Sequence, residues 1–121
     1  MIKTSRREFQ TLVSEVLEAL PVEFSQRISK VEIVVESEPP PDIREKFPRG
    51  ILLGLYQGTP LTGESTFRSY SMPNRISLYQ QNIERICSSR SQIREQVRKT
   101  LLHEIGHHFG LKEGDLRKAG Y

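Results

Sequence analysis

The sequence predicts an α+β fold in which a small sheet packs against helices. Three observations lead to this prediction: an amphipathic helical pattern at the N-terminus, short β-branched segments in the middle, and a long helical pattern near the C-terminus. The chain has 121 residues, which is enough for one domain with a single buried core. We therefore expect one domain over residues 1–121.

The N-terminal part has apolar residues at helical spacing with charged residues between them. This stripe comprises Phe9, Leu12, Val13, Val16, Leu17 and Leu20. It predicts an amphipathic helix over residues 6–20 that stops at Pro21, because proline cannot continue a helix. Phe24 and Ile28 then indicate a short connecting turn or a second helical piece.

The first strand is predicted at residues 31–36, where β-branched residues alternate with charged ones. Three consecutive prolines follow at residues 39–41, and proline is excluded from the interior of a sheet. The prolines therefore end the strand and predict a long loop that extends to about Gly50.

Two further strands are predicted in the middle of the chain. Residues 51–57 are mainly apolar, and Gly54 among them indicates a bulge or a close approach of the backbone to a neighbour. Residues 61–74 are polar, contain glycine and proline, and predict a loop or a hairpin. Residues 75–79 alternate and predict the third strand.

The C-terminal part is predicted to be helical. Residues 82–86 indicate a short helix, and Ser89 with Gln92 resembles a capping box at the start of a long helix over residues 90–109. A short last helix is expected over residues 111–119. The long helix has one wide apolar arc, formed by Val97, Leu101, Leu102, Ile105 and Phe109.

Residues 103–107 have the sequence His-Glu-Ile-Gly-His, which matches the zinc-hydrolase pattern His-Glu-x-x-His. His103 and His107 are one turn apart on a helix, so both imidazoles can reach one metal ion. Glu104 lies about 100° around the helix from His103 and can act beside the metal as a general base. Catalytic zinc lowers the pKa of its bound water to about 7. His108 lies nearer the apolar arc and is interpreted as a packed or supporting histidine rather than a ligand.

Catalytic zinc usually has three protein ligands and an open position for water, and a carboxylate is the expected third ligand here. Glu113 occupies the place of the third histidine in the pattern His-Glu-x-x-His-x-x-Gly-x-x-His. Gly110 can turn the chain and bring Glu113 under the metal. Asp115 is the alternative third ligand, and its competing interpretation is an N-cap of the last helix. The more distant candidates are Glu64 and Glu84.

The net charge of +3 at pH 7 comes from basic residues that are dispersed and interleaved with glutamate. This pattern is typical of a solvated surface, so we expect no nucleic-acid partner. The single cysteine, Cys87, cannot form an intramolecular disulfide and fits a reducing compartment as a partly buried residue. We find no signal peptide and no run of about 18 apolar residues, and therefore expect a cytoplasmic protein without a membrane partner.

Six segments of the chain have sequences that can be compared with those of a known family. These segments are Leu20–Phe24, Val31–Glu36, Leu53–Leu61, Pro73–Tyr79, Ile83–Cys87 and Val97–Gly110. Together they resemble the small bacterial zincin-like metallopeptidases, a family long described as a domain of unknown function. The resemblance covers nearly the whole chain. It implies a minimal zincin-like fold, with a small mixed sheet packed against an active-site helix and a backing helix. It also implies that His103 and His107 bind Zn2+ and that Glu104 is the base.

These observations favour a zinc-dependent metallopeptidase that hydrolyses peptide bonds in a peptide or protein substrate. Zincins commonly bind the substrate as an extended strand at a sheet edge, and Leu52–Gln57 or Arg75–Tyr79 could provide that edge. The alternative function is a non-catalytic metal-binding interaction module. A purely structural zinc site usually has four ligands, mainly cysteine and histidine, and only two histidines here are suitably placed.

Overall fold

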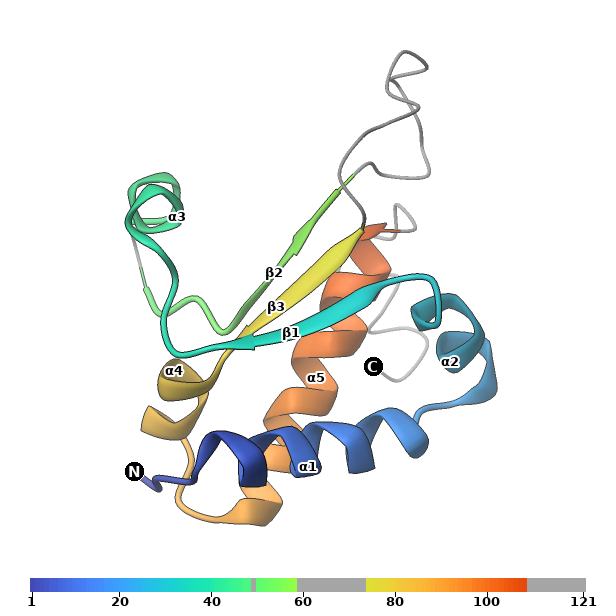
Figure 1. Cartoon of the computed structure of the whole chain (residues 1–121), viewed down its shortest axis with the longest axis horizontal. Coiled ribbons are helices and arrows are strands. Elements are labelled where there is room, and N and C mark those ends of the chain that lie inside the picture. The colour runs from blue at the N-terminus through green and yellow to red at the C-terminus, as the bar shows by residue number, and fades with distance from the viewer. Residues whose placement is uncertain (49, 59–73, 109–121) are drawn as a thin grey trace.

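The computed structural model describes residues 1–48, 50–58 and 74–108, except for the side chains of residues 107 and 108. This part of the chain contains five helices and three strands (Figure 1). The helices are α1 (Arg6–Glu18), α2 (Val22–Ile28), α3 (Pro41–Lys46), α4 (Gln80–Arg85) and α5 (Arg90–His108).

The sheet consists of β1 (Glu32–Glu36), β2 (Gly54–Gln57) and β3 (Arg75–Tyr79), in the order β1-β3-β2. β3 pairs in parallel with β1 and antiparallel with β2, so the sheet is mixed. The expected α+β fold with a small mixed sheet is therefore confirmed. The suggestion that Arg75–Tyr79 offers a sheet edge is wrong, because β3 is the middle strand and both its sides are paired.

One hydrophobic core joins the inner face of the sheet to α1 and α5. Ile76 and Leu78 of β3 are fully buried in it, and Ile33 and Val35 of β1 pack against it. In Figure 1, α5 passes behind the sheet and crosses α1. α1 is thus the backing helix and α5 the central one. The predicted apolar arc of α5 is confirmed for its described members, since each is at most 1% exposed: Val97, Leu101, Leu102 and Ile105.

α1 begins where the sequence predicts but ends earlier. Ser5 is its N-cap, and the Ser5 side chain accepts a hydrogen bond from the backbone N–H of Glu8. The helix ends at Glu18 rather than at residue 20, because the chain must leave helical geometry before Pro21. The second helical piece is confirmed as α2, which places Phe24 and Ile28 in the core.

The segment expected to be one long loop before Gly50 contains α3. Pro40 has extended backbone angles and serves as the N-cap, while Pro41 occupies the first turn. Proline is well suited to that turn because its missing N–H would be unpaired there in any case. The prediction was wrong at this point because three prolines can begin a helix as well as end a strand. The second strand also begins later than predicted, at Gly54 instead of residue 51.

The start of α5 confirms the predicted capping box with one change. The Ser89 hydroxyl accepts a hydrogen bond from the Gln92 N–H at 3.1 Å, as expected for the N-cap. The Gln92 side chain returns to the backbone N–H of Ser88 rather than to that of Ser89. The short helix before it is α4, which begins two residues earlier than predicted.

Arg6 covers part of the outer edge of β1. Its guanidinium donates to the backbone carbonyl of Val35 at 3.0 Å and to the Gln80 side chain at 2.8 Å. Val35 directs this carbonyl away from β3, because alternate residues of a strand bond to opposite sides. The contact therefore ties α1 to both β1 and α4, and it occupies an acceptor that another strand would otherwise use.

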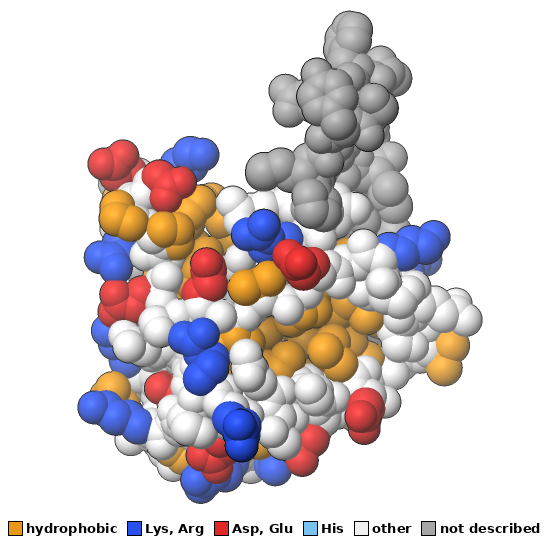
Figure 2. Space-filling model, viewed as in Figure 1, with side chains coloured by type: hydrophobic (Ala, Val, Ile, Leu, Met, Phe, Trp, Pro, Cys, Tyr) orange, Lys and Arg blue, Asp and Glu red, His pale blue; other side chains and the backbone are white. Residues whose placement is uncertain are grey.

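Acidic and basic side chains are interleaved over the face seen in Figure 2, and apolar side chains gather between β1 and α1. No basic patch dominates this face, in agreement with the dispersed charge of the sequence. Among the helices of the described part, none has the length and apolar character needed to span a membrane.

Gly54 allows α5 to lie directly against β2. A Cβ atom built at Gly54 would be 2.6 Å from Thr100 Cγ2 and 3.0 Å from the carbonyl oxygen of Ser77. Carbon atoms do not approach each other so closely, so only glycine permits this contact. The expected close approach at Gly54 is confirmed, and it sets the distance between the central helix and the strand.

We expect Gly54→Ala to lower the free energy of unfolding by about 1–3 kcal/mol, because the added methyl group overpacks the contact with Thr100. Urea unfolding followed by circular dichroism measures this loss. Thr100→Ser is the matched control, since serine lacks the γ-methyl group that the new Cβ would meet. The double variant Gly54→Ala/Thr100→Ser should recover part of the loss, and additive losses would contradict the proposed steric cause.

Candidate metal centre and active site

α5 places His103 and Glu104 in a groove between this helix and β2. The groove has a volume of about 390 Å³, and both side chains are half-buried in it. The strand side is formed by the segment that leads into β2, and the helix side by residues of α5 that precede the histidine. The other lining residues are Leu52, Leu53, Gly54, Gln96, Lys99 and Thr100. The close contact at Gly54 therefore forms the floor of the candidate site.

The Glu104 carboxylate lies at the outer edge of β2. Its Oε1 accepts a hydrogen bond from the backbone N–H of Tyr56 at 2.8 Å. Tyr79 donates its N–H to the Leu53 carbonyl, so in the antiparallel register Leu55 is the next residue bonded to β3. Tyr56 follows Leu55 and is out of phase with the bonded positions, so it directs its N–H away from β3. Glu104 thus occupies a donor that belongs to the sheet edge.

The Tyr56 side chain anchors this end of β2. The ring packs against the core, and its hydroxyl donates to the Asn74 side chain at 2.8 Å. Burial raises the pKa of the Tyr56 hydroxyl above its usual value, so the group is a neutral donor at physiological pH. The contact joins β2 to the residue that precedes β3, and it holds the amide of Tyr56 in place beside Glu104.

The two motif histidines lie on one continuous helix. α5 extends to His108, so the backbone from His103 to His107 is helical and the two residues are one turn apart. The helical backbone thus confirms the one-turn spacing of the motif. His103 lines the groove, and the side chains of His107 and His108 are outside the described part of the structure.

The candidates for the third metal ligand fall into two groups. Glu113, Asp115 and Glu64 lie outside the described residues, as do Phe109, Gly110, the expected last helix at 111–119 and most of the expected loop at 61–74. Within residues 1–48, 50–58 and 74–108, no three His, Cys, Asp or Glu residues are grouped so that they could hold a metal ion.

Glu84 belongs to a different part of the molecule. It is 4% exposed, and its Oε2 accepts hydrogen bonds from the Thr4 N–H at 2.8 Å, the Thr4 hydroxyl at 2.7 Å and the Gln80 amide at 3.1 Å. Glu84 precedes the first turn of α5, whereas His103 lies several turns further along that helix. Its carboxylate therefore anchors the N-terminal segment, and we no longer consider it a metal ligand.

The residues at the groove suit a zinc ion by their chemistry. Imidazole and carboxylate groups are ordinary zinc ligands, and the groove contains the imidazole of His103. The half-buried Glu104 lies beside His103 and is held by an amide, so it is oriented by the protein. Such a hydrogen bond to a carboxylate is the usual means of fixing its position near a metal.

Three residues of the groove were not expected from the sequence. Thr100 forms the helix side of the close contact with Gly54, and Lys99 lies one turn before His103 on the same side of the groove. The Tyr56 amide could not be recognised at all, because a backbone N–H leaves no trace in residue type. The glycine within an apolar strand was the available signal, since it indicated that another element approaches there.

The comparisons with known proteins agree with this geometry. Residues 28–121 match the zincin-like metallopeptidase family, so the chain belongs to that family. Among curated proteins, none matches the chain. A solved structure of a conserved hypothetical protein from T. thermophilus is similar, with a TM-score of 0.55 and 25% sequence identity over 86% of this chain and 92% of that one. The expected family and fold are thus confirmed.

Cys87 lies apart from the groove and in the core. It is 2% exposed, and burial raises the pKa of its thiol, with the positively charged N-terminus opposing this effect only in part. The thiolate is the reactive form of cysteine. A raised pKa therefore makes Cys87 a poor nucleophile at neutral pH, which agrees with a packing role.

We expect Cys87 in the folded protein to react with a thiol reagent at pH 8 at least about tenfold more slowly than in urea, because the residue is 2% exposed and its raised pKa lowers the thiolate fraction. Absorbance of the released thiolate measures both rates. The variant Cys87→Ser/Ser88→Cys is the matched control, since residue 88 is exposed. Equal rates for Cys87 in both states would show that the thiol is accessible.

Proposed function

We propose that this protein is a zinc-dependent metallopeptidase that hydrolyses peptide bonds in peptide or protein substrates. In this proposal, His103 and His107 bind Zn2+, and Glu113 is the third ligand, with Asp115 as the alternative. Glu104 is the general base. Membership of the zincin-like metallopeptidase family supports the reaction class, and the residue assignments rest on the motif and its position on α5.

The observation that carries the proposal is the position of Glu104. Its carboxylate is half-buried in a groove, beside His103, and within hydrogen-bonding distance of the edge of β2. A general base must be close to the atom from which it takes a proton, and a peptidase must also hold an extended substrate close to that base. Both requirements meet at the contact between Glu104 and Tyr56.

A zinc ion bound to these ligands would supply a water of low pKa and would polarise the substrate carbonyl. Glu104 would accept the proton of the attacking water at its carboxylate and later deliver a proton to the leaving amine. The half-buried groove would exclude part of the bulk water around this proton transfer. His103 would hold its position through the helix rather than through a mobile loop.

The outer edge of β2 would bind the substrate backbone. The backbone groups of Gly54 and Tyr56 point away from β3, so an extended peptide could add there as a further strand. Such a peptide would compete with Glu104 for the Tyr56 N–H. In this way, substrate binding would release Glu104 Oε1 from the strand and make the carboxylate available as a base.

Zinc binding should depend on the motif histidines and on one downstream carboxylate. We expect His103→Ala, His107→Ala and Glu113→Ala each to weaken zinc binding by at least about tenfold, because each removes one of about three protein ligands. Asp115→Ala should mainly remove a helix cap worth about 0.5–2 kcal/mol of folding stability. Competition with a chromophoric chelator gives all four zinc affinities on one scale.

The outcome of this comparison also identifies the ligand. If Asp115→Ala releases zinc and Glu113→Ala does not, Asp115 is the third ligand and the metzincin-like spacing does not apply. Stoichiometric zinc in the variant His103→Ala/His107→Ala would contradict the whole site. Glu84→Gln is a matched control, since that carboxylate is engaged by Thr4 and Gln80 and should leave zinc affinity unchanged.

Glu104→Gln should retain zinc and lose hydrolysis. Glutamine has the same shape and can still accept the Tyr56 N–H, but it cannot take a proton, and general-base catalysis contributes roughly 10²–10⁴-fold. Cleavage of casein by the wild type and the variant, with and without a chelator, measures this loss. Equal cleavage by both proteins would exclude Glu104 as the base. Zinc binding without cleavage of any substrate would favour a non-catalytic metal-binding module.

A further inference from the structure

A second pocket lies next to the groove, on the other side of Leu52. It has a volume of about 350 Å³ and is lined by the residues that precede α3, by Arg44 of α3, by the chain between α3 and β2, and by α4. Leu52 lines both this pocket and the groove that contains His103 and Glu104. The two hollows are therefore consecutive along the segment that leads into β2.

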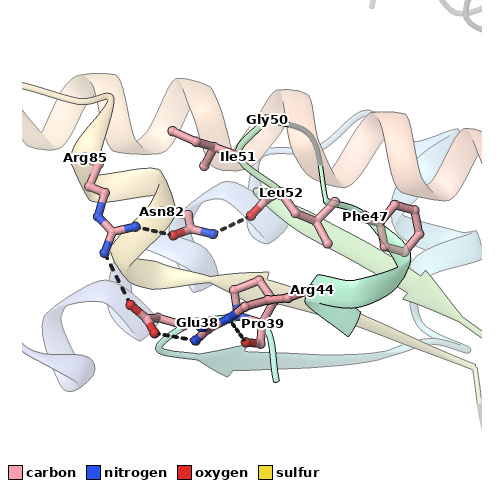
Figure 3. A pocket seen from close by; sticks show the side chains of 9 residues that line it. All are labelled: Glu38, Pro39, Arg44, Phe47, Gly50, Ile51, Leu52, Asn82 and Arg85. Carbon is pink, nitrogen blue, oxygen red and sulfur yellow. Dashed lines mark hydrogen bonds and ion pairs between the residues drawn. The ribbon is translucent and has the colours of Figure 1, made fainter. Parts of the chain in front are cut away.

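A chain of hydrogen bonds builds one side of the pocket (Figure 3). The Glu38 carboxylate pairs with Arg44 at 2.7 Å and with Arg85 at 3.3 Å. Arg85 also donates to the Asn82 side chain at 2.9 Å, and the Asn82 amide donates to the Leu52 carbonyl at 2.8 Å. These bonds hold both guanidinium groups in place and connect them to the strand segment.

The pocket has an excess of positive charge and of hydrogen-bond donors. Two guanidinium groups face one carboxylate, so the cluster carries a net charge of +1. Arg44 uses two N–H groups, toward Glu38 and the Pro39 carbonyl, and Arg85 uses two, toward Glu38 and Asn82. Each guanidinium has five N–H groups. The remaining donors suit a second carboxylate, which a guanidinium binds well.

The other side of the pocket is apolar and exposed. Phe47 is 44% exposed and Ile51 is 52% exposed, and both line the pocket together with Leu52. In Figure 3, Ile51 and Leu52 lie near Asn82, and Phe47 lies at the end of the pocket opposite Arg85. Large apolar side chains beside a fixed positive group form a surface that an apolar side chain and a neighbouring carboxylate can share.

The pocket also lies at a definite distance from the candidate base. An extended chain advances by about 3.3 Å per residue, so four residues along β2 and its leading segment separate Tyr56 from Leu52 by about 13 Å. A peptide that lies along the outer edge of β2 past Glu104 therefore reaches the pocket with a side chain about four residues from the bond at Glu104.

We propose that this pocket is a substrate subsite that binds a large apolar residue and an acidic residue two positions from it, about four positions from the scissile bond. Side chains two positions apart lie on the same face of an extended peptide, so both can enter one pocket. The inference rests on the proposed peptidase function for the location of that bond. The binding preference itself depends only on Arg44, Arg85 and the apolar side chains, so it can be tested separately.

The first experiment measures binding without cleavage. Fluorescein-labelled alanine-based octapeptides carry one Phe-Ala-Glu, Phe-Ala-Lys or Ala-Ala-Glu segment, and they are called the Phe-Glu, Phe-Lys and Ala-Glu peptides after the two outer residues of that segment. They are titrated with the full-length Glu104→Gln protein, and fluorescence anisotropy gives the Kd values. We expect the Phe-Glu peptide to bind at least about fivefold more tightly than either other peptide. In the background of the variant Arg44→Ala/Arg85→Ala, Phe-Glu should bind no better than Phe-Lys. Equal Kd values for the three peptides would overturn the proposal.

Matched controls separate the pocket from general effects. Arg94→Ala removes an exposed, ion-paired arginine on α5 that lies outside the pocket, and it should leave all three Kd values unchanged. Phe47→Ala should remove the advantage of Phe-Glu over Ala-Glu. Circular dichroism would show whether the double variant Arg44→Ala/Arg85→Ala folds. If it does not fold, the single variants Phe47→Ala and Arg44→Ala still test the proposal, because both residues are exposed and their substitution should not disturb the core.

The second experiment uses the wild-type protein and a library of proteome-derived peptides, with cleavage sites read by mass spectrometry. We expect an apolar residue and an acidic residue two positions apart to be enriched about four residues from the cleaved bond. The variant Arg44→Ala/Arg85→Ala should lose this enrichment while cleavage continues. Cleavage without such enrichment would overturn the subsite. If no peptide is cleaved but the Phe-Glu preference persists in binding, the peptidase function fails and the pocket remains a peptide-binding site.

Discussion

The contact between Gly54 and Thr100 is the constraint on which the candidate site depends. It brings α5 against β2 without an intervening side chain, so the next turn of the helix carries Glu104 to the edge of the strand. A side chain at residue 54 would push the helix outward. This movement would lengthen the hydrogen bond between Glu104 and the Tyr56 amide beyond its normal distance. The groove, the position of Glu104 and the outer strand edge therefore all depend on the missing side chain at residue 54.

The parts of the fold that the sequence predicted correctly are those with a strong local signal. α5 follows from a long apolar arc and a capping box, and α1 follows from an apolar stripe bounded by a proline. α3 was not predicted, because the run of prolines at residues 39–41 is compatible both with the end of a strand and with the start of a helix. The order of the strands could not be predicted from local sequence either. Nothing within residues 75–79 indicates that this strand pairs with a neighbour on each side.

The same division applies to the candidate site. His103 and Glu104 could be predicted because their spacing has a direct geometric meaning on a helix, and the structure places both in one groove. The Tyr56 amide, Thr100 and the pocket beside Leu52 could not be predicted. Their roles arise from elements that come into contact only after folding. The residue type reveals neither the direction of a backbone N–H nor that one residue lines two pockets.

An exposed strand edge that can bind a peptide can also pair with a strand of another copy of the same protein, and this is how many β-rich proteins begin to aggregate. Arg6 protects the edge of β1 by occupying the Val35 carbonyl, and Glu104 protects the edge of β2 by occupying the Tyr56 amide. Pairing of two such edges would also bury the charge of Glu104 away from water, which is unfavourable. We therefore expect that a protein without the charge of Glu104 is more prone to self-assembly, even though its core is unchanged.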